Sequence, residues 1–190
     1  GLPDRRRQRF QRTLGRSAAL TEIALVGSTL IYRLEPPAKS TDGVNPAPGR
    51  VLDGSSLTLR SSFDPESLDR ARDGDRRTHW SAPMQDGEWL EIGWRQPVPV
   101  VGLELEISER PHDYPRAYRI ESSLDGQTWR AVAQADPFYP PITDFLRPRD
   151  FVLRFDLPPH PARYLRFEQT GASADHPWSI AEVRVRFDSP

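Results

Sequence analysis

Ten residues in the first half of the chain, ARDGDRRTHW at 71–80, combine two carboxylates, a glycine, a hydroxyl and a tryptophan. Asp73, Asp75 and Thr78 supply hard oxygen atoms, the kind of ligand that Ca²⁺ selects in proteins. Gly74 lets the segment turn sharply, because glycine tolerates positive φ. The spacing therefore predicts a loop that holds a structural calcium ion, and it points to binding rather than catalysis.

Two alternatives explain the same loop without a metal. Asp73 and Asp75 can form Asx turns, in which a carboxylate accepts a hydrogen bond from its own nearby backbone. In the other alternative, the guanidinium of Arg76 or Arg77 lies where the cation would be. In both cases the loop would be a purely local structural feature.

Composition narrows the function classes. The chain has 190 residues, enough for one domain and an appendage. A net charge of −1 gives no indication of a nucleic-acid partner. The absence of cysteine excludes disulfides and thiolate chemistry. The chain begins with Gly1 rather than Met, so we expect it to be a fragment of a longer protein.

No enzyme motif is present in the sequence. The histidines lie on separate segments, at His79, His112, His160 and His176. No Gly-x-Ser-x-Gly elbow, His-Glu-x-x-His pair or phosphate-binding glycine loop occurs. His160 stands in LPPHP, which predicts a turn. We therefore expect the chain not to be an enzyme.

The first 49 residues predict an appendage and a linker. Phe10, Leu14 and Ala18 have helical spacing in the basic segment 4–20, which predicts a short amphipathic helix, either docked on the domain or close to a membrane. Residues 22–26 and 29–34 are rich in β-formers and flank a Gly-Ser turn, which predicts a hairpin. We expect the appendage to be 1–35, the Pro-rich linker 36–49 and the main domain 50–190.

From residue 50 the pattern is one of strands and turns. Apolar and polar residues alternate with period two in three segments, Val101–Ile107, Phe151–Leu157 and Val183–Phe187. Two further segments, Trp89–Trp94 and Tyr118–Ser122, also predict strands. Short strands of this kind, separated by Pro, Gly and Asp turns, predict an all-β fold, an antiparallel β-sandwich.

The order of these motifs resembles a known family. In sequence order they are ARDGDRRTHW, WLEI at 89–92, VGLEL at 101–105, YRIESSLDGQTW at 118–129, ARYLR at 162–166 and SIAEV at 179–183. Together they make residues 56–188 similar to the discoidin-like domain, also called the coagulation factor 5/8 type C domain, and to carbohydrate-binding modules of family 32. The resemblance implies a galactose-binding-like jelly roll of about eight strands.

The resemblance also implies a metal site that ties the early loop to the last strand. Carried over to this sequence, the Ca²⁺ side-chain ligands are Asp73, Thr78 and Glu182. Backbone oxygens near Ala71, Asp75 and Ala181 complete the set. The ion would be structural, and it would stabilise the fold by binding only the folded state.

Loops at one end of the sandwich hold the ligand site in this family. Here these loops are 81–88, 109–116, 136–150 and 171–178, and the candidate ligand-binding residues are Ser81, Arg110, His112, Tyr114, His176 and Trp178. Galactose-type members commonly carry a histidine where this chain has Ser81. The alternative is that Arg110 pairs with Glu109 or Asp113 and that Trp178 is part of the core. Some relatives bind lipid through apolar loop tips, for which the candidates here are Phe138, Tyr139, Ile142, Phe145 and Leu146.

The sequence thus predicts a non-catalytic module that binds a glycan or polysaccharide and belongs to a larger envelope or exported protein. We expect an extracytoplasmic, bacterial location, with a membrane or a protein partner close to the N-terminal side. The alternative is a structural or protein-interaction domain with a degenerate ligand site, for example the soluble C-terminal end of a membrane glycosyltransferase.

Overall fold

The computed structural model describes residues 20–26, 29–34, 50–145 and 148–188. The chain divides into two compact units, Gly1–Pro48 and Gly49–Pro190. In the first unit, β1 (Leu20–Val26) and β2 (Thr29–Leu34) pair antiparallel, as the predicted hairpin strands require. The helix predicted for 4–20, apart from Leu20 in β1, and the linker predicted for 36–49 lie outside the described residues.

The second unit consists almost entirely of strands and single helical turns. Its elements are β3 (Arg50–Leu52), η1 (Gly54–Ser56), β4 (Thr58–Ser61), η2 (Pro65–Ala71), β5 (Trp80–Ala82), β6 (Glu88–Glu106), β7 (Tyr118–Ser123), β8 (Arg130–Ala135), α2 (Ile142–Phe145), η3 (Pro148–Asp150), β9 (Val152–Gln169), β10 (Trp178–Ile180) and β11 (Glu182–Phe187).

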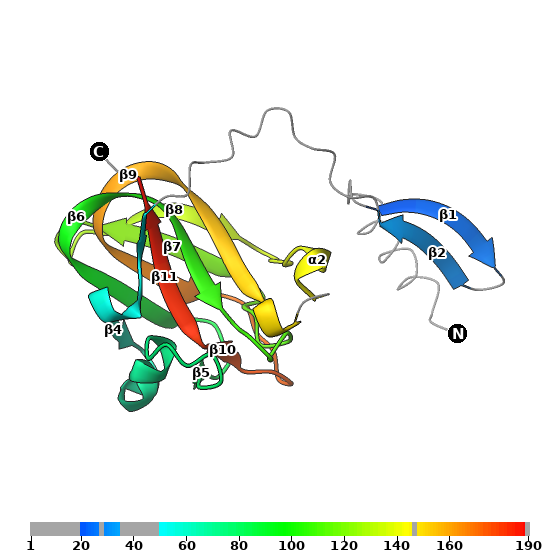
Figure 1. Cartoon of the computed structure of the whole chain (residues 1–190), viewed down its shortest axis with the longest axis horizontal. Helices are drawn as coiled ribbons and strands as arrows, with labels where there is room; N and C mark the ends of the chain where they lie inside the picture. Colours follow the sequence, from blue (N-terminus) through cyan, green and yellow to red (C-terminus); the bar gives the residue numbers. More distant parts are fainter. Residues whose placement is uncertain (1–19, 27–28, 35–49, 146–147, 189–190) are drawn as a thin grey trace. The chain divides into compact units, whose positions relative to one another are not determined.

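Two long, bent strands, β6 and β9, build both layers of a sandwich (Figure 1). Their segments 88–93 and 164–169 pair with each other, with β4 on one side and β7 and β8 on the other. Their segments 100–106 and 152–160 also pair, and β11 and β3 extend that layer. The predicted antiparallel β-sandwich is confirmed.

The bends follow from the sequence of the two strands. Proline has no N–H to donate to a ladder, and both bends carry proline, Pro97 and Pro99 in β6 and Pro158–Pro161 in β9. The register shifts between Gly93 and Val98, and again between Val100 and Gly102. Because of the second irregularity, the predicted alternation is wrong at one position: Val100 is buried, and Val101, which the pattern places on the buried side, is only half-buried.

The core lies between the layers and is closed by aromatic side chains. Trp80 and Trp178 are completely buried and meet edge to face, with ring centroids 5.1 Å apart. Phe167 packs on Trp178 at 5.4 Å and on Phe155 at 5.2 Å. Each large apolar side chain buried in this way contributes about 1.5–3 kcal/mol to folding.

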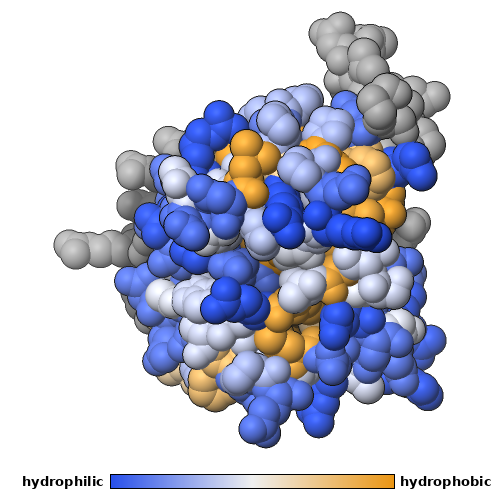
Figure 2. Space-filling model, turned by 90° about the vertical axis from the view of Figure 1, so that its left-hand side faces the viewer, coloured by the Kyte–Doolittle hydropathy of each residue, from blue (hydrophilic) through white to orange (hydrophobic). Residues whose placement is uncertain are grey.

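The exterior is mainly hydrophilic on the face shown in Figure 2, where apolar side chains form patches between polar ones. In the described residues, the large apolar side chains with substantial exposure are scattered along the chain, at Val51, Phe63, Leu124 and Tyr139. Single exposed apolar residues are ordinary for a soluble domain surface. One of them, Leu124, borders a cavity that becomes important below.

Candidate functional site

The loop between η2 and β5 gathers oxygen atoms around the hydroxyl of Thr78. Thr78 Oγ1 lies 2.7 Å from Asp73 Oδ2, 3.0 Å from the carbonyl oxygen of Asp75 and 3.3 Å from that of Arg70. A hydroxyl has one hydrogen to donate, so it cannot satisfy all three acceptors at once. In donor chemistry, this group of hard oxygens fits Ca²⁺. The carbonyl beside Thr78 belongs to Arg70, one residue before the predicted Ala71.

Glu182 connects the last strand, β11, to this loop. Its Oε1 accepts a hydrogen bond of 2.6 Å from the backbone N–H of Gly74, which has a φ of +81°. The side chain is buried, and burial raises the pKa of its carboxyl; the charge of Asp73 acts in the same direction. A buried carboxylate close to a second, exposed one favours a cation between them. Sequence positions 108 residues apart are thus joined directly.

Asp75 faces Thr78 with its backbone oxygen, the atom that the resemblance assigns to the metal, while its carboxylate pairs with Arg77. Its carboxylate accepts two hydrogen bonds of 2.8 Å from the guanidinium of Arg77, which with the Arg77 backbone N–H lower its pKa to about 2. Only its backbone oxygen faces Thr78. A side-chain role for Asp75 as a metal ligand is therefore not supported by its contacts.

The two metal-free alternatives are partly realised. Asp73 Oδ1 accepts from the N–H of Asp75, and Asp75 Oδ1 accepts from that of Arg77, which are the predicted Asx turns. Arg76, however, pairs with Glu106 and Asp150. Within the described ranges, no ion pair involves Asp73 or Glu182, and no cluster of three or more His, Cys, Asp or Glu side chains suits a metal. Any cation here depends on carbonyl oxygens as well as on side chains.

Ser81, the middle residue of β5, belongs to a chain of hydrogen bonds. Ser81 Oγ lies 2.9 Å from Ser179 Oγ, and Ser179 Oγ donates to Asp113 Oδ2 at 2.7 Å. Because the Ser179 hydrogen is used there, Ser81 must donate to Ser179. The guanidinium of Arg110 lies 3.9 Å from Asp113, as the alternative to ligand binding requires. Pairing of β5 with β10 brings these residues together.

His112 and His176 meet although they come from different loops. Their rings stack with centroids 5.2 Å apart and an interplanar angle of 27°. His176 lines an open cavity of about 480 Å³, together with residues 83–85 and 172–177. Gln169 connects the two loops, since its Nε2 donates to the carbonyls of Gln85 and Gly171. Two of the loops predicted from the sequence therefore do form one concave surface.

Tyr114 has a covered ring. The guanidinium carbon of Arg116 lies 4.0 Å from its centroid, while Phe138 and Phe145 pack against it edge to face. Phe138 also contacts Tyr118 and Phe155, so this part of the 136–150 loop belongs to the edge of the core. Tyr139, with 66 % exposure, is the candidate lipid-contacting side chain that faces solvent in the described part of this loop.

Trp178 is a correction to the predicted ligand set. Its ring is completely buried between Trp80 and Phe167 and cannot stack on a sugar. The reason is the register of the short β10–β5 pair, in which Trp178 lies opposite Ala82 and faces the core. The alternative, a core tryptophan, is the one observed.

The sequence reasoning missed the residues that organise the site from behind. Asp113 and Ser179 connect Arg110 to Ser81; the sequence names Asp113 only as an alternative partner of Arg110 and assigns no role to Ser179. Ser179 is the first residue of the SIAEV motif, two residues before the predicted Ala181, so the motif contains this residue but does not indicate its hydrogen bonds. Pairing of β5 with β10, which a local pattern does not reveal, decides this role.

The family assignment comes from comparison of the sequence with family profiles. The F5/8 type C domain profile matches residues 55–183, more than half of the chain. The chain belongs to the F5/8 type C domain family. The predicted discoidin-like resemblance is thus confirmed, and the 71–80 loop, Glu182 and the loops that carry His112 and His176 lie within the matched range.

Solved structures with the same fold are family 32 carbohydrate-binding modules. CBM32-3 from a family 31 glycoside hydrolase of Clostridium perfringens has 23% identity and a TM-score of 0.55, covering 73% of this chain and 95% of its own. The C. perfringens module CpGH89CBM32-5, in complex with GalNAc-β-1,3-galactose, has 11% identity, a TM-score of 0.57 and coverages of 72% and 99%. The module of C. perfringens NanJ, in complex with galactose, has 16% identity and a TM-score of 0.54, and the match covers 72% of this chain and 98% of that module. At these identities the similarity establishes the fold.

Among curated proteins, none matches this F5/8 type C domain chain. In the part of the chain that the structure describes, the helices are all too short to cross a bilayer.

Proposed function

We propose that the F5/8 type C domain is a non-catalytic module that binds carbohydrate at the cavity beside His176. The observation that carries this proposal is the meeting of loops 83–85, 109–113 and 172–177, which places His112, His176 and Arg110 at one end of the sandwich. Family membership supports it, as do neighbours of the same fold that are solved with galactose or GalNAc-β-1,3-galactose.

The chemistry of the cavity suits hydroxyl groups. Imidazole nitrogens donate or accept hydrogen bonds, and a guanidinium donates several from a fixed plane. The Arg110 side chain is 46% exposed, so its remaining donors face solvent despite the 3.9 Å approach to Asp113. Met84 and Pro177 give apolar walls in place of an aromatic platform. We expect a shallow site that recognises the end of a glycan.

We propose further that the Ala71–Trp80 loop holds a structural Ca²⁺. Asp73, Thr78 and Glu182 supply side-chain oxygens, and the carbonyls of Arg70 and Asp75 supply backbone ones. The carbonyls predicted at Ala71 and Ala181 are further candidates for the set. The buried, unpaired carboxylate of Glu182 supports a positive charge at this place. The ion would stabilise the closed loop and leave the sugar site to the other loops.

An accessory role fits a module of this kind. We infer that it attaches a larger extracytoplasmic bacterial protein to a glycan or polysaccharide. Neighbours of the same fold include a module from a family 31 glycoside hydrolase. The identity of the larger protein and of any protein partner follows from the gene, not from the domain.

One observation favours a second candidate, a structural or protein-interaction domain with a degenerate site. Ser81 occupies the position of the histidine expected for galactose-type sites, and its hydroxyl is already used by Ser179. Arg110 also approaches Asp113. If these contacts replace ligand contacts, the fold persists without sugar binding.

Glycan-array binding followed by calorimetry distinguishes these candidates. We expect saturable binding of a glycan by the wild type, reduced about tenfold or more in Arg110→Met and His176→Ala, since a hydrogen bond from a charged group contributes about 1.5–3 kcal/mol. Arg95→Met is the matched control, because Arg95 has an exposed side chain in the bend of β6, outside all four candidate ligand loops. Melting temperatures show that each variant is folded.

Absence of binding to every glycan by the folded wild type would overturn the carbohydrate proposal and favour the degenerate site. Equal loss in Arg95→Met would show that the effect is one of net charge alone. Binding that survives both site variants would place the ligand elsewhere on the domain.

A further inference from the structure

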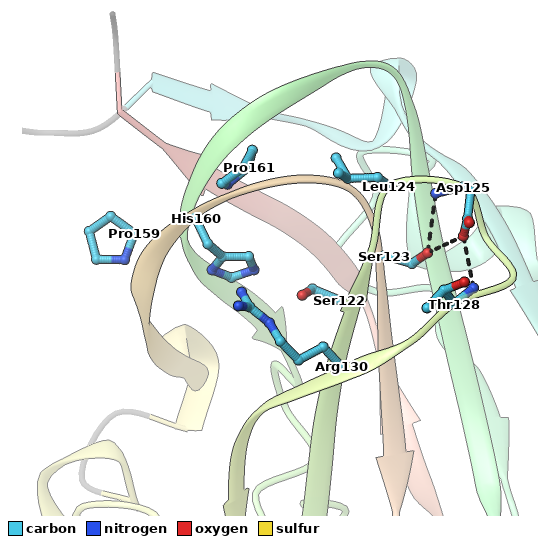
Figure 3. Close-up of a pocket in the computed structure, with 9 residues that line it drawn as sticks. All are labelled: Ser122, Ser123, Leu124, Asp125, Thr128, Arg130, Pro159, His160 and Pro161. Carbon is cyan, nitrogen blue, oxygen red and sulfur yellow. Dashed lines mark hydrogen bonds between the residues drawn. The ribbon is translucent and has the colours of Figure 1, made fainter.

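A second cavity, of about 510 Å³, lies away from the site proposed above. It is formed by the turn after β7, the start of β8 and the Pro159–Pro161 bend of β9 (Figure 3). The β7–β9 ladder separates the two sites. Tyr118 pairs with Gln169 next to the His176 cavity, whereas Ser123 pairs with Tyr164 next to the second one. A volume of this order is in the range of small-molecule sites.

His160 has one ring nitrogen without a partner. Its Nδ1 lies 2.6 Å from the carbonyl oxygen of Pro158, and because a carbonyl only accepts, Nδ1 must carry the hydrogen. In the neutral ring, Nε2 then has a lone pair and is an acceptor. The residue is only 7% exposed, and its Nε2 atom is buried and makes no hydrogen bond within the described part of the chain. A buried acceptor without a donor costs free energy that a ligand can recover.

Arg130 faces this ring across the cavity. Figure 3 shows its side chain reaching from β8, past Ser122, toward the imidazole of His160. Within the described ranges no carboxylate lies within ion-pair distance of its guanidinium, in contrast to Arg119 and Arg166 on the neighbouring strands. Arg130 is exposed and has several rotatable bonds, so it can move aside and let a hydroxyl reach Nε2.

The charge in the cavity is balanced, which favours a neutral ligand. Asp125, on the turn that leads to Arg130, also lines it, and hydrogen bonds from the Thr128 and Gln127 N–H groups and from Ser123 lower the pKa of its carboxyl to about 2. Donors and acceptors therefore stand side by side. Hydroxyl groups use both, whereas a phosphate or carboxylate ligand would face the charge of Asp125.

Apolar surface completes the site. Leu124 is 53% exposed at the rim, and Pro159 and Pro161 line the cavity from the β9 bend (Figure 3). Burying such exposed groups against the C–H face of a sugar ring is favourable. Rigid proline rings also hold the cavity open without a loss of entropy on binding.

We propose that this cavity is a second binding site, for one residue of a neutral saccharide. A ligand hydroxyl donates to His160 Nε2, Arg130 donates to that hydroxyl or its neighbour, and the sugar ring lies on Leu124 and the prolines. The site is independent of the His176 cavity. A domain with both sites would bind one glycan at two positions or two separate glycan chains.

Amide NMR spectra of the labelled chain, titrated with galactose, N-acetylglucosamine and glucuronate in separate arms, test this proposal. A neutral sugar is expected to shift the amides of Leu124, Arg130 and His160. Arg130→Met and His160→Gln should each weaken that binding about tenfold or more. Arg50→Met is the control, because Arg50 is exposed on β3, which pairs with β11 away from the cavity, and has no ion pair within the described ranges. Unchanged shifts elsewhere in the spectra show that the variants are folded.

Each outcome separates the two sites. Shifts at both cavities, each lost only in its own variants, support both proposals. Shifts confined to His112 and His176 overturn this inference and leave the proposed function intact, while shifts confined to the second cavity do the reverse. Shifts there with glucuronate alone would contradict the neutral class, and no shift at the second cavity in any arm would overturn the site.

Discussion

The clasp, formed by residues 71–80 and Glu182, and the ligand loops, which carry Arg110, His112 and His176, lie in the same domain but differ in how their polar groups are used. In the clasp, the polar side chains bond within the protein, to their own loop, to β11, or, for Arg76, to Glu106 and Asp150. In the ligand loops, Arg110 and His112 are exposed, and His176 borders open space. The polar groups of the first region are used within the fold, whereas those of the second remain open to solvent.

Trp178 shows that the boundary between the two regions runs through the ligand loops themselves. It follows His176 by two residues and yet is fully buried against Trp80, the last residue of the clasp loop. The predictions below test whether stability belongs to the clasp and its core contacts and recognition to the exposed loops.

The largest expected effect is that of Trp178→Ala. Truncating a fully buried tryptophan leaves a cavity and should lower the free energy of unfolding by about 3–5 kcal/mol. Urea denaturation followed by fluorescence measures it. Tyr139→Ala, at an aromatic residue with 66% exposure, is the control and should change stability by less than about 0.5 kcal/mol. A stable, folded Trp178→Ala protein would contradict the core assignment.

Calcium removal is the next test, directed at the clasp alone. With calcium at about a hundredfold excess over its dissociation constant, linkage stabilises the fold by about 2.7 kcal/mol, so chelation should lower the melting temperature by about 5–10 °C. Glu182→Gln should remove this response, because the amide keeps an acceptor for Gly74 N–H but loses the charge. Identical melting curves with and without chelator would exclude the ion.

Glu106 gives a test by pH. Burial acts to raise the pKa of its carboxyl, but hydrogen bonds from Ser108, Arg184 and Arg76 outweigh burial and hold it below the ordinary value of 4.5. The stability from this group is therefore present above pH 4.5 and is lost as the pH falls through the lower, folded-state pKa.

Glu106→Gln should accordingly cost about 1–2 kcal/mol at neutral pH and less in acid, where wild type and variant converge. Chemical denaturation across a pH series measures the difference. Glu104→Gln, on the same strand but half-buried, is the matched control. A difference that grows in acid would show that the sign is wrong.

The smallest effect is expected for Arg77→Met. Arg77 pairs with Asp75 on the surface of the clasp loop, and exposed pairs contribute little because water screens them. Melting temperature and glycan affinity should both stay unchanged. If the melting temperature falls only in the presence of calcium, the Asp75 carboxylate is more important to the clasp than its contacts indicate.

Much of the fold follows from local sequence. Leu153, Phe155 and Leu157 alternate with polar residues and are all buried, as their period predicts. The 71–80 motif correctly predicted contact with Glu182, although only through the family resemblance and not from spacing. The burial predicted for Val101 is wrong, because the register shift between Val100 and Gly102 turns Val100 toward the core instead. A local pattern does not contain such a shift.

The ligand site was less predictable from sequence. The loops of His112 and His176 come together, whereas Trp178, for which the sequence leaves both a ligand role and a core position open, lies in the core. Whether an aromatic side chain at a loop end points outward depends on which strand pairs with it. That pairing, between β5 and β10, joins segments about a hundred residues apart.

The sequence by itself determined the strand content, the family and the absence of thiol chemistry, because these depend on residue type and on spacing within a few residues. The tertiary structure decided three other points: that Trp178 closes the core, that Ser81 bonds Ser179, and that His160, placed in a proline-rich turn, borders a cavity with Arg130. Each brings together distant segments: the pairing of β5 with β10 positions Trp178 and Ser81, and the bend of β9 carries His160 to the cavity that Arg130 lines from β8.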